Sequence, residues 1–505
     1  MIPLTYRLRD RVRLTQSEGS WRVICDVPLS VLRVNEAAAR LLSRTRHTAS
    51  VTQLAAALAL DEERTLRLCE YFRGKGLLDV GIDPAADVTP RVSVIVPAKD
   101  RASELAECLA AVFAVDYPRE AFEVLVVDDG STDDTAAVAG RFPCRVLVNP
   151  QTRGQSFARN LAATRASGEI LAFIDSDCVA DPGWLRQLVP FFAWELVVAV
   201  GGLVTGFSSA SALDRYEEAS SSLNMGRRLL LALDEAGTFY VPTCNLLVRR
   251  EDYLAAGGIR DEMRVGEDVD LCWRLRARGG AMVYAPVGAV SHKHRDRLGA
   301  MLRRRTQYGT SEARLQVLHK DKRPTLPITP LPLLTFVALT ISLMVRDARL
   351  APLACLPLVC DATRRGVHLR REGIRMPARR VALASLRGHL SYVYFLQFRL
   401  VRYHLLALVG AGFVLPALWP VAGFAALYAS AVDYSTRRPR LGYPAFLVYY
   451  VLEHSAYQVG VALGCLRQRT VRPYRLSFRA AAVGRARPAR SRRPSSTVGV
   501  GQTTV

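Results

Sequence analysis

The first 85 residues contain short amphipathic segments that begin at polar capping residues. Residues 23–34 have a strand-like pattern, and Asn35 is a plausible cap for a helix over 35–42. Further helices are predicted over 50–58 and 61–74, because a polar residue precedes an apolar periodic stretch in each case. Helix, turn, helix and a closing apolar pair at 77–78 predict a winged-helix domain over residues 1–85.

Between residue 91 and about residue 325, unbroken apolar runs alternate with stretches of helical periodicity. The run 92–96 fits a strand that is buried on both faces of a parallel sheet, and 102–113 has helical spacing. Further strands are predicted over 124–127, 145–148 and 170–174. This alternation predicts one α/β domain with helices on both faces of its sheet.

Beyond residue 328 the chain becomes strongly apolar. The runs are 331–345, 405–432, which Pro416 and Pro420 break, and 443–466, which Glu453 and His454 interrupt. None is a clean run of about 20 apolar residues. The pattern predicts apolar membrane-associated helices over 328–466, with a soluble helical bundle as the alternative, and then a basic, disordered tail over 467–505.

Charge and cysteine content narrow the functional class. Lys and Arg number 68 against 46 acids, giving +22, and residues 466–505 hold ten arginines and no acid. A nucleic-acid binder usually spreads charge over a folded face, so this tail predicts an anionic membrane surface and no nucleic acid. The ten cysteines include no C-x-x-C pair, and the start has no signal-peptide core. We expect free thiols in a reducing cytoplasm, and a protein located at the cell membrane with its catalytic domain facing the cytoplasm.

Carboxylates follow directly after predicted strands of the central domain. Asp128 and Asp129 follow one strand, where ligands of open α/β sheets bind, and a carboxylate there can accept the N–H of a pyrimidine base. A helix N-cap is the alternative. Asp175 and Asp177 follow another strand and point the same way, so they can hold a hard divalent cation together with substrate phosphates.

Three more segments carry candidate chemistry. Asp268, beside Glu267 at a predicted helix start, could act as a general base on a hydroxyl; capping and ion pairs with Arg274 and Arg276 are the alternative. His292 and His294 could reach the metal or a diphosphate, and a structural role is their alternative. Residues 303–308 (RRRTQY) could contact phosphate or be solvated at the surface.

In this order, the pieces resemble the family 2 glycosyltransferases, which have the GT-A fold. The matching set is 94–98 (VIVPA) with Asp100, 127–131 (VDDGS), 159–160 (RN), 175–177 (DSD) and 267–268 (ED) with Arg274. The resemblance implies that Asp100 and Asp129 hold the uracil of a UDP-sugar, in a donor site that also includes Pro97, Asp128, Arg159 and Asp175. It also implies that Asp177, with Asp175 and His292, binds Mg²⁺ or Mn²⁺. Asp268, with Glu267, would deprotonate the acceptor hydroxyl in an inverting displacement.

The N-terminal region is similar to PqqD-like winged-helix domains, which recognise modified precursor peptides, at 31–39 (VLRVNEAAA), 51–58 and 76–78. This domain order resembles the glycosyltransferases of mycofactocin biosynthesis. That resemblance implies transfer of β-linked glucose, in one or several units, to a peptide-derived redox cofactor or its precursor. A lipid or cell-envelope polysaccharide acceptor is the alternative. For the N-terminal region itself, DNA binding or a packing role is the alternative.

Two features separate this chain from other enzyme types. No G-x-G-x-x-G follows the first strand of the central domain, where 97–100 (PAKD) stands, which argues against a dinucleotide oxidoreductase. Residues 303–308 only loosely resemble the Q-x-x-R-W box of processive cellulose and hyaluronan synthases. Because the Trp is absent, long-chain processivity is not expected.

Overall fold

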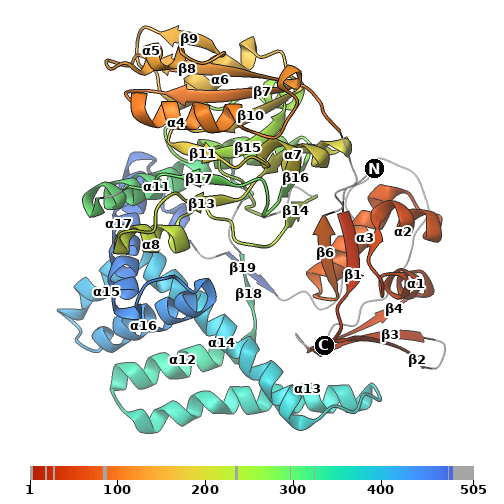
Figure 1. Ribbon diagram of the computed structural model, residues 1–505. Coiled ribbons are helices and arrows are strands. Elements are labelled where there is room, and N and C mark those ends of the chain that lie inside the picture. Colours follow the sequence, from red (N-terminus) through yellow and green to blue (C-terminus); the bar gives the residue numbers. More distant parts are fainter. Residues whose placement is uncertain are drawn as a thin grey trace. The chain divides into compact units, whose positions relative to one another are not determined.

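The computed structural model describes residues 4–17, 20–26, 29–82, 88–233, 237–295, 297–322, 325–475 and 477–480. The chain forms two compact units, each built from segments distant in sequence (Figure 1). Residues 84–324 and 430–475 form the first, called here the sheet unit. Residues 2–83, 325–429 and 476–505 form the second, the helical unit. From residue 481 onward the predicted basic tail lies outside the described residues.

An eight-stranded mixed sheet forms the centre of the sheet unit, in the order β14-β16-β12-β15-β10-β7-β8-β9. Its parallel half confirms the strands predicted from the apolar runs: β10 (Ile170–Ile174), β7 (Val92–Ala98), β8 (Phe122–Asp129) and β9 (Arg145–Asn149). Strand β15 runs antiparallel to both β10 and β12, which the sequence pattern did not predict. This second half comprises β15 (Asn245–Arg249), β12 (Val197–Gly201), β16 (Ala281–Tyr284) and β14 (Leu230–Ala232).

The sheet is buried on both faces. Ile95, Leu125 and Phe173 point to one face, where they pack with helices α6 (Gln155–Arg165), α9 (Arg250–Ala255) and α10 (Glu267–Ala277). Alternate positions such as Val94 are equally buried and point to the other face, on the side of α4 (Ala102–Phe113) and α5 (Thr135–Ala139) (Figure 1). Both faces being covered explains why these strands have apolar runs rather than alternation.

Shorter elements extend the sheet unit next to the carboxyl ends of the parallel strands. Strands β11 (Cys178–Ala180), β17 (Val290–His292) and β13 (Val204–Gly206) form a separate three-stranded sheet. Helix α7 (Trp184–Leu188) precedes β12 in the chain, and helix α8 (Ala212–Ser220) follows β13. The loops after β7, β8 and β10 carry the acids that the sequence singled out.

Helix α17 (Tyr443–Arg467) packs tightly against α11 (Leu298–Leu318) in the sheet unit. A Cβ added to Gly460 would lie 2.0 Å from the carbonyl oxygen of Thr306, and one added to Gly464 would lie 2.6 Å from that of Thr310. The two backbones therefore approach as closely as only glycine allows. This corrects the interpretation of 443–466 as a membrane-associated run, because residues such as Phe446, Tyr450 and Val461 are buried in the sheet unit, although Val448 and Leu466 are exposed.

The helical unit contains the first 82 residues. Helices α1 (Glu36–Arg44), α2 (Val51–Leu58) and α3 (Glu62–Gly74) are capped by Asn35, Ser50 and Asp61, which confirms the helices predicted from those residues. The strands form two three-stranded sheets, β5-β1-β6 and β2-β3-β4. Their bounds are β1 (Leu4–Leu8), β2 (Val12–Ser17), β3 (Ser20–Asp26), β4 (Leu29–Val34), β5 (Ala49–Ser50) and β6 (Leu78–Ile82). The assignment to PqqD-like domains stays a prediction.

The rest of the helical unit is α12 (Pro330–Val345), α13 (Cys355–Arg371), α14 (Ala378–Tyr403), α15 (Leu405–Gly412) and the first part of α16 (Leu418–Arg437), with β18 (Thr325–Ile328) paired to β19 (Ser477–Ala480). The second apolar run is interrupted near Pro416, as predicted, whereas the predicted break at Pro420 is wrong because that residue lies in the first turn of α16. Ile24 and Val31 of the β2-β3-β4 sheet share a core with Leu369, Ile374 and Val381. Among the helices described, none is both long enough and apolar enough to span a bilayer.

Candidate active site

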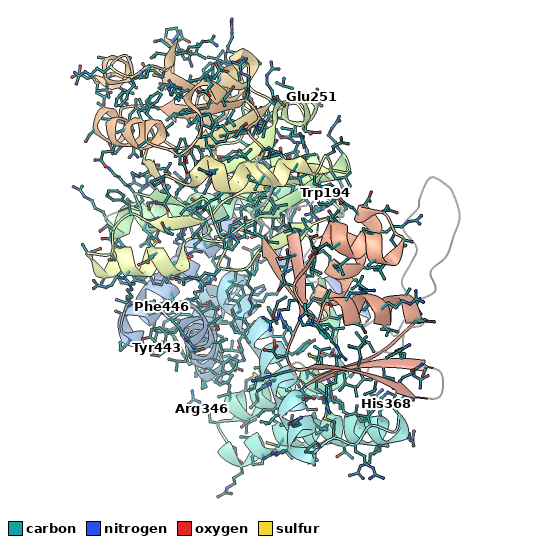
Figure 2. All side chains as sticks on the ribbon, turned by 45° about the vertical axis from the view of Figure 1, so that its right-hand side comes forward. Trp194, Glu251, Arg346, His368, Tyr443 and Phe446 are labelled. Atoms are coloured by element: carbon teal, nitrogen blue, oxygen red, sulfur yellow. The ribbon has the colours of Figure 1, made fainter. Side chains whose placement is uncertain are left out.

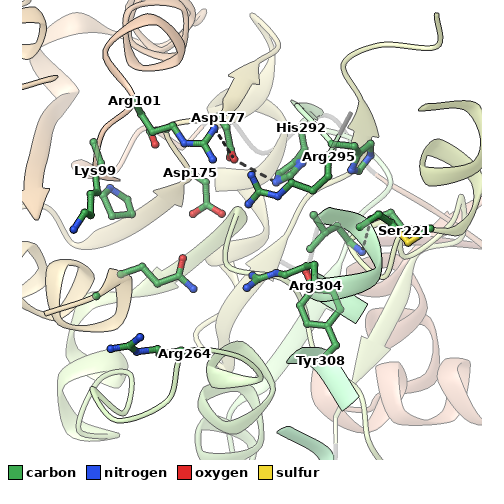
Figure 3. A pocket seen from close by; sticks show the side chains of 18 of the residues that line it. Lys99, Arg101, Asp175, Asp177, Ser221, Arg264, His292, Arg295, Arg304 and Tyr308 are labelled. Atoms are coloured by element: carbon green, nitrogen blue, oxygen red, sulfur yellow. Dashed lines mark hydrogen bonds and ion pairs between the residues drawn. The ribbon is translucent and has the colours of Figure 1, made fainter. Parts of the chain in front are cut away.

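A cavity of about 370 Å³ opens in the sheet unit beside the ends of β7 and β10, and α11 forms part of its wall (Figure 3). Its wall combines acids with a larger set of cations. The acids are Asp129, Asp175, Asp177 and Glu217, and the cations are Lys99, Arg101, Arg264, Arg295, Arg304 and Arg305. Such a wall suits a ligand that carries several negative charges and brings a metal ion with it.

Asp177 and His292 meet at one corner of this cavity. A carboxylate oxygen of Asp177 lies 3.6 Å from Nε2 of His292, and its other oxygen lies 3.7 Å from Arg101. Asp175 lines the same cavity and has an exposed side-chain fraction of 25%. All three residues predicted to hold a metal therefore line the same cavity.

Cys178 joins this corner, since its sulfur, an Asp177 oxygen and a His292 nitrogen lie within 4.8 Å of one another. Burial raises the pKa of the Cys178 thiol well above its usual value, and a soft sulfur ligand suits Mg²⁺ or Mn²⁺ less well than oxygen. The donors that fit a divalent cation are therefore carboxylate oxygens and one imidazole nitrogen. The buried Nδ1 of His292 has no hydrogen-bond partner among the described residues.

Arg159 lies behind the cavity wall. Its guanidinium is 1% exposed and contacts Asp175 at 2.5 Å and Glu267 at 3.7 Å. Arg159 is not among the residues that line the cavity. It fixes the two carboxylates relative to each other, so the contacts favour a positioning role over the predicted contact with the donor.

Of the two acids predicted to hold a uracil base, Asp100 and Asp129, only Asp129 lines the cavity. Asp129 lines the cavity with Pro97, and its carboxylate accepts hydrogen bonds from Asn149 and from the backbone N–H groups of Arg153 and Gly154. These bonds hold the loop after β9, where Gly154 has a φ of +100° that favours glycine. Asp129 therefore shapes the cavity wall as well as facing it.

Asp128 and Asp100 lie outside the cavity lining. Asp128 is buried and accepts the N–H of Ser131 at 3.1 Å. Asp100 is exposed, and hydrogen bonds from Thr132 hold the pKa of its carboxyl below the usual range. Both carboxylates order the loops after β7 and β8, and their roles in donor binding stay predictions.

The pair Glu267 and Asp268 begins α10, directly after Gly266, which has a φ of +74°. Glu267 accepts a hydrogen bond from the cavity residue Gln155 at 2.7 Å. Burial, and then the adjacent Glu267 carboxylate, raise the pKa of Asp268 to about 7. A carboxylate with that pKa can take a proton near neutral pH, but neither Glu267 nor Asp268 is among the residues that line the cavity.

The alternative role for this pair is ion pairing with arginines of the same helix. In the structure a different acid, Asp270, makes that contact. Asp270 is fully buried and contacts Arg274 at 2.8 Å, Arg260 at 3.2 Å and His319 at 2.8 Å. Arg274 also donates to the carbonyl oxygens of Ala256 and Gly258. Asp270 therefore anchors α10, which leaves Asp268 outside the ion-paired cluster.

Several functional candidates were missed by the sequence motifs. Arg264 and Arg295 line the cavity from loops with no recognisable pattern, whereas Arg304 and Tyr308 come from the segment flagged for phosphate contact. The Arg304 guanidinium lies 4.8 Å from the Tyr308 ring centre. His294 is neutral, because burial, then His292 and Arg305, lower its pKa to about 3.

Sequence comparison shows which known proteins the chain is similar to. Residues 93–254 match the family described as Glycosyl transferase family 2. Over 254 residues the chain is 32% identical to the "Pre-mycofactocin glycosyltransferase" of Mycobacterium tuberculosis, covering 50% of this chain and 53% of that protein. The chain thus spans about half the length of this relative. It is 30% identical over 238 residues to "Glycosyltransferase AglE" of Haloferax volcanii, covering 46% of this chain and 76% of that protein.

Among solved structures, the chain resembles "Mannosyltransferase PcManGT from Pyrobaculum calidifontis in complex with GDP-Man and Mn2+" at 21% identity and a TM-score of 0.39, covering 70% of this chain and 99% of that one. That likeness is too weak to bear on function. The classification of this chain therefore rests on the sequence matches. The chain belongs to glycosyl transferase family 2.

Proposed function

We propose that the sheet unit transfers a glucosyl group from a UDP-sugar to a hydroxyl of a peptide-derived acceptor. One observation carries the proposal. Asp175, Asp177 and His292 lie in a single cavity with a cationic wall that includes Arg264 and Arg304. A nucleotide diphosphate with its metal ion has the charge pattern that this cavity complements.

Asp177, Asp175 and His292 would hold the metal. An imidazole nitrogen among carboxylate oxygens favours Mn²⁺ over Mg²⁺, which prefers an all-oxygen set. When bound, the metal neutralises charge on the diphosphate leaving group. Arg159 keeps Asp175 oriented, and Arg101 limits the rotation of Asp177 through their 3.7 Å contact.

The reaction balances as a single displacement. The acceptor oxygen forms a bond to the anomeric carbon while the bond from that carbon to the phosphate oxygen breaks, and UDP leaves. Asp268 receives the acceptor's proton, and its pKa of about 7 leaves much of it ionised at neutral pH. Attack opposite the leaving group inverts the anomeric centre, so an α-linked donor gives a β-linked product.

The acceptor that we propose is mycofactocin or its peptide-derived precursor, modified with one or several glucose units. The 32% identity to a relative named as a pre-mycofactocin glycosyltransferase supports this choice. The N-terminal domain would supply peptide binding through a strand edge, since β4 is an edge strand of its sheet. If the peptide-derived acceptor is wrong, the alternative is a lipid or polysaccharide acceptor.

Calorimetric titration of the full chain with UDP tests the site. We expect UDP to bind more tightly with Mn²⁺ than with EDTA, and Asp177→Asn to remove that difference. Asp116→Asn is a matched control, because Asp116 is a surface carboxylate that pairs with Arg186 at 2.7 Å. Equal UDP affinity with and without metal in the wild type would contradict the metal site.

Titration with the precursor peptide tests the acceptor separately. The full chain is used because the N-terminal sheet shares a core with α13 and α14, so removing residues 1–85 would expose that core. Saturable peptide binding that persists in Asp177→Asn supports the peptide acceptor. No binding at high micromolar peptide, with UDP binding intact, would remove that acceptor and keep the donor site.

A further inference from the structure

Helix α12 of the helical unit buries polar residues and exposes aliphatic ones. At 100° per residue, one narrow face of this helix carries four exposed aliphatic side chains. They are Leu334, Val337, Ile341 and Val345, with exposed fractions of 52%, 41%, 50% and 61%. The buried positions of α12 are instead Thr335 and Ser342. A helix that borders water has the opposite arrangement.

Polar contacts hold the inner side of this helix. Thr335 lies 2.8 Å from Nδ1 of His389 on α14 and donates to the carbonyl oxygen of Ala354. Ser342 donates to the carbonyl oxygen of Asp347 at 3.0 Å. The polar side chains thus join α12 to its neighbours, while the four aliphatic side chains of the other face are each about half exposed.

A second apolar segment lies next to the end of α12. The turn between α15 and α16 exposes Phe413 by 77% and Val414 by 89%. Arg346, labelled in Figure 2, directly follows α12 and donates to the carbonyl oxygen of Pro416 in this turn at 2.9 Å. The face of α12 and this turn therefore form one surface, called here the apolar edge and defined by Leu334, Val337, Ile341, Val345, Phe413 and Val414.

The segment that carries the apolar edge is strongly basic. Residues 330–429 contain twelve arginines and three acids. The acids are engaged within the unit, since Asp361 pairs with Arg365, Glu372 pairs with Arg33, and Asp347 caps the turn after α12. Arg346 and Arg349 flank the apolar edge and are exposed. A partner that is both apolar and anionic satisfies these features together.

We propose that the apolar edge inserts into the headgroup and acyl boundary of an anionic lipid bilayer, without crossing it. Interfacial binding of this kind combines buried apolar area with attraction between arginines and acidic lipids. A second copy of the chain would bring the same arginine excess against itself, so the charge favours lipid. The anionic leaflet that faces the cytoplasm is the surface where this chain would then be held.

Sedimentation of the full chain with vesicles tests the proposal. We expect binding to vesicles of phosphatidylcholine mixed with phosphatidylglycerol, weaker binding to phosphatidylcholine alone, and weakening by salt. Val345→Ser and Val414→Ser should each reduce vesicle partitioning about tenfold, because each removes one inserted aliphatic side chain. Val148→Ser is the matched control, since Val148 is also 61% exposed but lies on β9 of the sheet unit.

Light scattering without lipid tests whether a second copy of the chain, rather than lipid, covers the apolar edge. A wild-type chain that is monomeric and binds vesicles supports the proposal. A stable dimer that Val345→Ser converts to a monomer, with no vesicle binding, would assign the apolar edge to a second copy instead. Thermal unfolding of each variant confirms that it is folded, and unchanged vesicle binding by folded Val345→Ser and Val414→Ser would overturn the proposal.

Discussion

Helices α12 and α17 are both apolar in sequence and both expose some aliphatic side chains, yet they differ in the residues that they bury. In the sheet unit, α17 buries Phe446 and Tyr450 and approaches α11 at Gly460. In the helical unit, α12 buries Thr335 and Ser342 and exposes its aliphatic face. An apolar run therefore does not establish whether its residues meet protein or another phase. The position of the polar residues around the helix decides between them.

The polar residues of α17 take part in a buried network. Glu453 accepts from Tyr216 at 2.6 Å and lies 3.3 Å from Arg305, which also contacts Glu217 at 2.7 Å. These groups come from α8, α11 and α17, so one cluster joins three segments of the sheet unit. The acid that interrupted the apolar run in the sequence is thus a structural anchor beside the cavity.

The largest expected effect concerns the catalytic chemistry of the sheet unit. Asp268→Asn should reduce transfer by roughly 10²–10⁴-fold, because it removes the proposed base while keeping its shape. Vesicle binding of Asp268→Asn should be unchanged. Val345→Ser should instead lose vesicle binding and keep its transfer rate. Initial rates and sedimentation on the same preparations measure both. Loss of UDP binding in Asp268→Asn would instead mean that this residue contacts the donor.

The raised pKa of Asp268 adds a pH dependence to this prediction. Below about pH 7 the carboxyl is protonated and cannot accept a proton, so the wild-type rate should fall about tenfold per pH unit. Above pH 7 the rate should level off. A profile of kcat/KM against pH that stays flat from pH 5 to 8 would contradict the assignment of this base.

The next effect concerns the network on α17. Glu453→Ala should lower the free energy of unfolding by about 3–5 kcal/mol, because it leaves Arg305 and Tyr216 buried without this partner. Denaturant unfolding measures the change. If α17 were instead a helix whose polar groups meet water, the same substitution would cost less than about 1 kcal/mol.

Glycine substitutions in the two units compare the packing directly. Gly460→Ala should destabilise by about 1–3 kcal/mol, because its Cβ would lie 2.0 Å from the Thr306 oxygen. Gly388→Ala on α14 has no atom within 4 Å of the added Cβ, so it should stabilise by about 0.5–1 kcal/mol. Equal shifts in Tm for the two variants would show that α17 is not tightly packed.

The smallest expected effect is on the stability of α12. Ile341→Ser should change the free energy of unfolding by less than about 0.5 kcal/mol without lipid, since its side chain is half exposed. Denaturant unfolding with and without anionic vesicles measures it. A large loss of stability in the absence of lipid would mean that the apolar edge is packed against protein.

The parallel half of the sheet could be predicted because strands buried on both faces leave unbroken apolar runs, as in β7 and β10. The antiparallel strands β12 and β15 have similar runs, but no local pattern records the direction in which a strand pairs. Helix starts were predictable where a side chain caps them, as at Asn35 and Asp61. The close approach of α11 and α17 was not, because it depends on residues far apart in sequence.

Some residues of the candidate site could likewise be predicted from the sequence, and others could not. Asp175 and Asp177 were predictable because they follow a strand directly, and the structure places both in the cavity. Arg264 and Arg295 were not predictable, since only the folded chain brings their loops to the same wall. The placement of Arg159 behind that wall also required the structure, because the sequence cannot distinguish a residue that touches a ligand from one that orients an acid.

Mass spectrometry of the product tests the central claim most directly. The full chain is incubated with UDP-glucose, Mn²⁺ and the mycofactocin precursor, and the acceptor mass is followed alongside release of UDP. The account predicts an acceptor that gains one or more hexose units with the wild type, and none with Asp177→Asn or with EDTA. An acceptor that gains hexose equally well in EDTA, or UDP-glucose that is never consumed although UDP binds, would contradict it.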